Sequence, residues 1–93
     1  MTEARRKRVI ITGLGCVGPH GDVDALWDGL RGGHSAIRKL SVFDPAGFHS
    51  QVAGEARGFD PSAHMAQRII NASSRCVQLA VAAAGMAIGN ASL

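Results

Sequence analysis

The longest apolar stretch of the sequence lies near its end, where residues 79–89 carry no polar side chain. A helix that is apolar on every face is typical of a segment buried on all sides. Ser73 or Ser74 supplies a cap for the start of this helix, because a serine oxygen accepts from the first free N–H groups. Gly85 costs about 1 kcal/mol relative to alanine in a helix interior, so we predict that packing demands a small residue there.

A second apolar stretch lies near the start of the chain, where Val9 to Thr12 read Val-Ile-Ile-Thr. These residues are β-branched, and the apolar positions are continuous instead of alternating. Such a pattern is typical of a strand that is buried on both faces, as in a parallel sheet. We therefore predict that Val9 to Thr12 form a buried strand near the centre of a sheet.

A short amphipathic helix is predicted after this strand and a glycine-rich loop. Asp22 is its N-cap, the helix runs through Leu30, and the glycines at positions 32–33 end it. Its apolar residues fall at helical spacing on one side: Val23, Leu26, Trp27 and Leu30. We interpret Trp27 as a core anchor of this side.

The middle of the chain is irregular and precedes one more helix. Short extended pieces are predicted at residues 35–39 and 51–56. Asp60 as N-cap and Pro61 at the first helical position then predict a helix within residues 59–70.

The length and the charge of the chain limit the classes of function that it can have. Ninety-three residues allow one small domain or part of a larger one. The formal net charge is +3, but without residues 1–8 the chain has six basic and six acidic side chains. We interpret residues 1–8 as a solvated basic lead-in and, without interleaved aromatic residues, predict no nucleic-acid partner. No stretch approaches the roughly 20 apolar residues that span a bilayer, and no signal peptide is recognised, so we predict no membrane partner and a cytoplasmic location.

Cysteine and histidine residues give no sign of a metal site. The two cysteines, Cys16 and Cys76, form neither a disulfide framework nor a C-x-x-C pair, which fits a reduced compartment. The histidines are scattered, without the spacing of metal ligands: His20, His34, His49 and His64. We predict no metal and interpret both cysteines as small buried hydrophobic residues.

Three glycines after the predicted strand match the dinucleotide-binding fingerprint G-x-G-x-x-G: Gly13, Gly15 and Gly18. Pro19 and Gly21 follow them, where a dinucleotide-binding helix would run uninterrupted. The helical pattern begins only at Asp22, so no helix N-terminus meets the glycines to receive a pyrophosphate. The acidic residue expected about 20 positions on is missing, because residues 32–34 are Gly-Gly-His.

Four ordered motifs carry a resemblance to a known family. They are RRKRVIITGLGCVGPHG (5–21), LWDGLRGGHSAIRKL (26–40), FDPAGFHSQVAGEARGFDP (43–61) and QLAVAAAGMAIGNASL (78–93). Together they resemble the start of the β-ketoacyl synthases, the condensing enzymes of fatty-acid and polyketide synthesis. The resemblance implies an α/β fold, the N-terminal part of a thiolase-like fold whose complete form is layered α-β-α-β-α. Residues 1–93 would be an incomplete N-terminal portion that supplies the first strand of a mostly parallel sheet.

The resemblance also implies a reaction, the decarboxylative Claisen condensation of an acyl thioester with malonyl-carrier protein. The acyl carrier protein brings the phosphopantetheine arm, so the resemblance implies no further cofactor and no metal. The family's catalytic cysteine and two histidines lie beyond the length of this chain, and neither Cys16 nor Cys76 has the context of the nucleophile. We therefore assign no catalytic, cofactor-binding or metal-binding residue here and expect the segment alone to be inactive. The rest of the ketosynthase, or a partner chain in a homodimer or heterodimer, is the expected partner.

Departures from the family pattern leave two alternatives. Many relatives have serine where this chain has Gly18, and many have a basic, Met-Asp-containing stretch where this chain has NASSRC (71–76). The first alternative is therefore a segment of a non-catalytic, chain-length-factor type of ketosynthase partner. The second is a nucleotide-binding protein that uses Gly13, Gly15 and Gly18.

Overall fold

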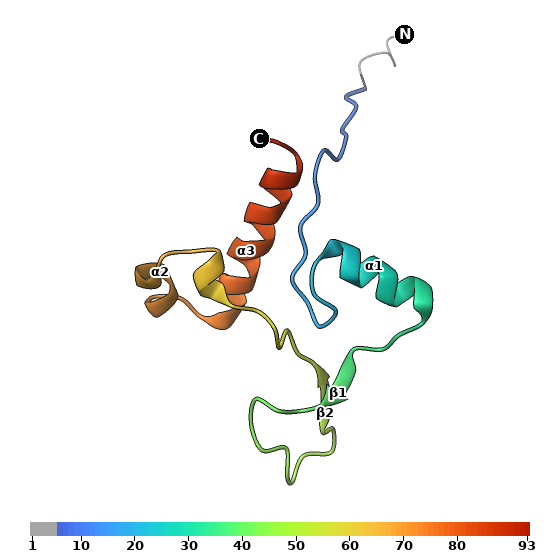
Figure 1. The fold of residues 1–93 in the computed structure, drawn as a ribbon, viewed down its shortest axis with the longest axis vertical. Helices are drawn as coiled ribbons and strands as arrows, with labels where there is room; N and C mark the ends of the chain where they lie inside the picture. The colour runs from blue at the N-terminus through green and yellow to red at the C-terminus, as the bar shows by residue number, and fades with distance from the viewer. Residues whose placement is uncertain (1–5) are drawn as a thin grey trace.

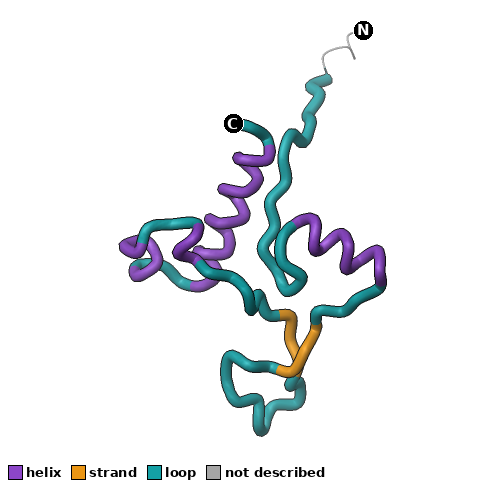
Figure 2. The backbone as a smooth tube through the Cα atoms, viewed as in Figure 1, coloured by secondary structure: helices purple, strands orange, loops and turns teal. Residues whose placement is uncertain are grey.

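The computed structural model describes residues 6–93, which form helices and a small sheet joined by long loops (Figures 1 and 2). In chain order the elements are α1 (Val23–Gly32), β1 (Ile37–Lys39), β2 (Val52–Gly54), the 3₁₀ helix η2 (Pro61–Ala63), α2 (Gln67–Asn71) and α3 (Arg75–Asn90). The chain is open, with a radius of gyration of 17.8 Å. A compact domain of this length has about 12 Å. Accordingly, four of the described residues are buried: Gly29, Pro45, Gln78 and Ala82.

Helix α1 begins after Asp22 as predicted and runs to Gly32, two residues beyond the predicted last residue Leu30. The Asp22 carboxylate accepts a hydrogen bond from the Ala25 N–H at 3.0 Å, and Gly33 ends the helix with a left-handed φ of 69°. The interpretation of Trp27 as a core anchor is wrong for this chain, because 61% of Trp27 is exposed. Helix α1 is covered at Gly29 instead, because the His20 ring lies against that residue.

The sheet differs from the mostly parallel sheet that we predicted. The extended pieces predicted in the middle of the chain are confirmed as β1 and β2, each three residues long. They pair antiparallel, with Arg38 opposite Ala53 at the centre. An antiparallel pair follows from chain connectivity, since β2 returns beside β1 after a single loop.

The prediction of a buried strand at Val9 to Thr12 is wrong for the described chain. This segment is an extended loop, and Val9, Ile10 and Ile11 are 90%, 78% and 81% exposed. A strand exists only through hydrogen bonds to a neighbour, and residues 6–93 place none beside it. Residues 1–5 of the basic lead-in lie outside the described part of the chain, and residues 6–8 are exposed as expected.

The helix predicted within residues 59–70 is divided into η2 and α2. Asp60 caps η2 as predicted, because its carboxylate accepts from the Ser62 N–H at 3.0 Å. The helix does not continue, since His64 leaves the helical conformation with φ −122°. Its ring stacks on Phe59, with ring centroids 5.5 Å apart. The prediction of one helix over this segment is therefore wrong, and the break coincides with a local stacking contact between residues five positions apart.

Helix α3 starts after Ser74, as predicted, but the Ser74 side chain makes no capping hydrogen bond. The helix is also not buried on all sides. Its inner face carries Ala82 and Gln78, and the Gln78 amide donates to the Ile70 carbonyl at the end of α2 at 3.2 Å. The opposite face is open, and a Cβ atom added at Gly85 would meet no other atom within 4 Å. The prediction that packing demands a small residue at position 85 is therefore wrong within residues 6–93, whose elements contact one face of α3.

Candidate functional site

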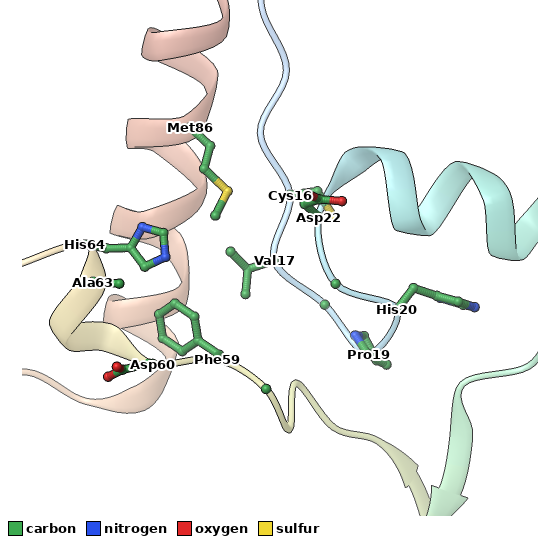
Figure 3. Close-up of a pocket in the computed structure, with 13 residues that line it drawn as sticks. Cys16, Val17, Pro19, His20, Asp22, Phe59, Asp60, Ala63, His64 and Met86 are labelled. Carbon is green, nitrogen blue, oxygen red and sulfur yellow. The ribbon is translucent and has the colours of Figure 1, made fainter.

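The glycine turn, residues 13–21, lies against α3 and forms the centre of the candidate site (Figure 3). A Cβ atom added at Gly13 would lie 2.4 Å from the Ala87 carbonyl oxygen, and one at Gly15 would lie 2.0 Å from that of Ala83. Both distances are far below van der Waals contact, so the two backbones meet as closely as glycine alone permits. The first two glycines of the fingerprint therefore pack against a helix.

The third glycine belongs to a tight reversal of the chain. Gly18 and Gly21 exchange two backbone hydrogen bonds of 3.0 Å, and Gly21 has φ 122°, a region that glycine tolerates. Helix α1 begins after this reversal, with the carboxylate of Asp22 accepting from the Ala25 N–H in its first turn. A pyrophosphate at that place would meet a carboxylate, so the geometry argues against a dinucleotide site.

A cavity of about 360 Å³ opens between the glycine turn, η2 and α3. Figure 3 shows Val17, Phe59, His64 and Met86 around this space. Cys16, which is half-buried, also lines it. Hydrogen bonds from the hydroxyl and the N–H of Ser62 lower the pKa of Asp60 at its edge. The volume lies at the lower end of the range for small-molecule sites.

The structure does not assemble a nucleophilic site from the cysteines and histidines of residues 6–93. Cys76 is exposed in the first turn of α3, so its interpretation as a buried residue is wrong, and its thiol lies 3.2 Å from the Ser74 hydroxyl. The nearest polar contact of His20 is the His34 carbonyl, 2.9 Å from Nε2. Within the described range no histidine is hydrogen-bonded to a thiol, and no three potential metal ligands cluster.

A cluster of hydrogen-bond donors around the Glu55 carboxylate, here called the Glu55 cluster, joins the two ends of the loop between β1 and β2. The sequence analysis did not identify it. Glu55, whose side chain is 9% exposed, forms an ion pair with Arg57 at 3.0 Å. It also accepts from the Ser41 hydroxyl at 3.0 Å and from the Val42 N–H at 3.1 Å. Burial acts to raise the pKa of Glu55, but these hydrogen bonds outweigh it and lower the pKa. The E-x-R spacing was the one sequence signal, since such residues share a face of an extended chain.

Helices that could cross a bilayer are absent from residues 6–93, since none there combines sufficient length with sufficient apolar character.

Comparisons with known proteins identify the family. Residues 6–93 match the model of the β-ketoacyl synthase N-terminal domain. The tetracenomycin polyketide synthase ketoacyl synthase alpha subunit of Streptomyces glaucescens is 40% identical over 95 residues, covering 100% of this chain and 22% of the relative. The beta subunit from the same organism is 37% identical over 86 residues, covering 91% and 21%.

A solved structure extends the similarity to the fold. It is described as the ishigamide ketosynthase/chain length factor and superposes with a TM-score of 0.85 at 37% identity, covering 95% of this chain and 22% of that one. The predicted fold class, the N-terminal part of a ketosynthase fold, is thereby confirmed. The chain spans about one fifth of the length of the curated relatives that it matches. With the family model matched over residues 6–93, the chain belongs to the β-ketoacyl synthase family.

Proposed function

We propose that this chain is the N-terminal portion of a β-ketoacyl synthase that condenses an acyl thioester with malonyl-carrier protein in polyketide or fatty-acid synthesis. The observation that carries the proposal is the superposition on a ketosynthase/chain length factor structure over 95% of the chain. In the proposed reaction the malonyl unit loses CO₂, its α-carbon attacks the acyl carbonyl, and the thiol leaves. The acyl carrier protein is the proposed donor of both thioesters, and the cytoplasm is the proposed location.

Within that enzyme we assign residues 1–93 a structural role. The described residues bring no histidine to either thiol, so we propose that the catalytic groups come from sequence outside this segment. What the segment contributes is a close junction, in which the glycine turn contacts the backbone of α3 at Gly13 and Gly15.

A segment exchange tests the proposal. In the tetracenomycin alpha subunit, the residues aligned with this chain are replaced by residues 6–93; we refer to the product as the chimera. The chimera is assayed with the beta subunit for CO₂ release from malonyl-carrier protein and for 3-oxoacyl product, beside the unmodified alpha subunit. We expect condensation to be retained. A soluble, folded chimera that fails to condense, while the unmodified subunit does, contradicts the proposal.

A non-catalytic partner of the chain-length-factor type is the second candidate, supported by the similarity to the ketosynthase/chain length factor structure. The matched experiment moves residues 6–93 into the tetracenomycin beta subunit and assays it with the unmodified alpha subunit. If this second exchange supports condensation while the first does not, the chain is assigned to the partner class.

A further inference from the structure

Residues 64–66 form a joint between η2 and α2, the two helical pieces of residues 60–71. The first piece already contains a bond of the α-helical type, because the Met65 N–H donates to the Pro61 carbonyl at 3.1 Å. The helical path ends at Ala66, whose φ of −68° is helical but whose ψ is 151°, against about −42° in a helix. The two pieces can therefore join only if ψ of Ala66 changes.

The local sequence does not favour a break at this joint. Helix α2 begins at Ala66 without a side-chain capping hydrogen bond, and alanine is a poor N-cap. Within the described part of the chain, the N–H groups of Ala66, Gln67 and Arg68 donate to no backbone carbonyl, whereas in one helix they would donate to the carbonyls four residues earlier. Residues 62–71 contain neither glycine nor proline, so no residue type interrupts a helix there.

A stack of side chains connects the η2 side of the joint to α3. The His64 ring stacks on the Phe59 ring, with centroids 5.5 Å apart (Figure 3). The Arg75 guanidinium of α3 lies 4.9 Å from the centroid of the same Phe59 ring, a cation–π distance. Arg75 also donates to the Ala56 carbonyl at 3.1 Å. This Arg75–Phe59–His64 stack therefore ties the point where η2 ends to the first turn of α3.

A buried amide connects the α2 side of the joint to the same helix. Gln78 of α3 is 8% exposed, and its side-chain amide donates to the carbonyls of Ile70 and Ser73, each at 3.2 Å. Joining α2 to η2 would turn α2 away from its present direction and would separate the Ile70 carbonyl from this amide. Because an unpaired buried amide is costly, Gln78 favours the broken form.

We propose that residues 60–71 are a two-state segment, which α3 holds in the broken form through the stack and the Gln78 amide, and which becomes one helix when these contacts are lost. Local preference and tertiary contacts oppose each other here, and such opposition leaves two conformations within reach of one another. The segment also bounds the cavity of the candidate site, since Phe59, Ala63 and His64 line it. A change at the joint would therefore reshape the wall of this cavity.

Nuclear magnetic resonance of the chimera tests the proposal through the carbon-13 shift of the Ala66 Cα and the amide exchange of residues 66–68. Without substitutions, we expect an extended shift and fast exchange. Gln78→Leu and Phe59→Leu each remove one of the two contacts, so each should move the shift towards the helical range and slow the exchange about tenfold. Phe43→Leu is the matched control, because Phe43 lies in the loop between β1 and β2, and it should change neither.

A further substitution should reverse the change. Ala66→Asp supplies the side-chain acceptor that the start of α2 lacks, and it therefore favours the broken form. When it is added to the Phe59→Leu chimera, we expect the Gln67 amide to return to fast exchange. Slow exchange of Gln67 in this double variant would contradict the proposal.

Three other outcomes overturn the two-state segment. The first is a helical Ala66 shift in the chimera without substitutions. The second is an unchanged joint in both Gln78→Leu and Phe59→Leu, because the contacts with α3 would then not hold the break. The third is faster exchange at Ile69 and Ile70 without slower exchange at residues 66–68, because the released segment would then be disordered and not helical. None of these readouts depends on condensation activity.

Discussion

The backbone N–H of Leu14 donates a hydrogen bond of 3.0 Å to Oδ1 of Asn90, joining positions 76 residues apart. Leu14 lies between the two glycines that touch α3, and Asn90 is the last residue of that helix. The bond therefore fixes the register of the glycine turn along the helix. Glycine permits the close approach, and the asparagine determines where it occurs.

Asn90→Ala should loosen this register without unfolding the protein. A hydrogen bond between exposed groups contributes about 1 kcal/mol, so we expect the Leu14 amide of the chimera to exchange about fivefold faster. Asn90→Asp is the matched control, because its carboxylate retains an acceptor oxygen at the same place. Equal exchange in wild type and Asn90→Ala would show that the glycines alone set the register.

Gly15→Ala should destabilise the chimera far more than Gly18→Ala. A methyl group at position 15 would lie 2.0 Å from the Ala83 carbonyl oxygen, whereas one at position 18 would meet nothing within 4 Å. Overpacking of this kind costs about 1–3 kcal/mol or more, while an alanine in open space changes stability by about 0.5 kcal/mol or less. The urea midpoint of each variant measures the difference. Equal loss in both variants would contradict the packing role.

The glycine contacts also predict the outcome of nucleotide titration. Because Gly13 and Gly15 face helix backbone and Asp22 occupies the start of α1, we expect no saturable binding of NAD, NADP or ATP by the 93-residue chain or by the chimera. Calorimetry checks this directly. Saturable binding that Gly18→Ala abolishes would restore the dinucleotide hypothesis.

The Glu55 cluster should hold the loop between β1 and β2 only while its carboxylate is charged. Its pKa is lowered from the ordinary 4.5 in the folded chain, so its contribution is fully present above about that value and is lost as the pH falls through the lower folded value. Glu55→Gln should therefore speed proteolysis within residues 40–51 of the chimera at about pH 7, and this effect should become smaller as the pH falls below about 4.5.

A control substitution in the same loop distinguishes the effect of the Glu55 cluster from a general loss of stability in acid. Asp44 accepts one N–H, that of Ala46, at 3.1 Å, and is not a hydrogen-bond partner of Glu55. In a protein that carries Asp44→Asn, Glu55→Gln should speed proteolysis at neutral pH as much as it does in the wild type. Thermolysin at about pH 7 and pepsin at about pH 3 measure the cleavage. An effect of Glu55→Gln that persists unchanged in acid would contradict the role of the charge.

Features encoded locally could be predicted from the sequence. The cap at Asp22 and the left-handed Gly33 depend on residues within one helical turn, and both were predicted. The Asp60 cap was predicted for the same reason. The helix predicted after it was too long. The stacking of His64 on Phe59 is a geometry of two rings that a periodic pattern of apolar residues does not record.

Features that depend on distant partners could not be predicted. The pattern at Val9 to Thr12 describes a buried strand, but burial needs neighbours that residues 6–93 do not provide. The same reason leaves Trp27 exposed and one face of α3 open. In the candidate site, the glycine pattern predicted a turn that requires glycine. Both a phosphate-binding loop and a loop packed closely against a helix have this requirement. Only the structure distinguishes between these two kinds of turn.

Neither cysteine should carry an acyl group. Among the described residues, no histidine is hydrogen-bonded to the thiol of Cys16 or Cys76, so neither thiol has the paired general base that activates a nucleophile. Mass spectrometry of the chimera after incubation with acyl-carrier protein should find no adduct at either position, and iodoacetamide should label the exposed Cys76 before the half-buried Cys16. A stoichiometric acyl adduct on either residue would relocate the active site into this segment.

The 93-residue chain alone should neither catalyse condensation nor unfold cooperatively. A chain of this length buries only about two thirds of its unfolded surface even when compact, and residues 6–93 leave sixteen large apolar side chains exposed. Ala82, at 2% exposure, is the one buried side chain of its hydrophobic core among residues 6–93. Urea titration followed by circular dichroism should therefore give a broad, non-cooperative transition, whereas the chimera should give a sharp one. A cooperative transition in the monomeric 93-residue chain would contradict this prediction and show that the chain is a self-sufficient domain whose exposed faces need no cover.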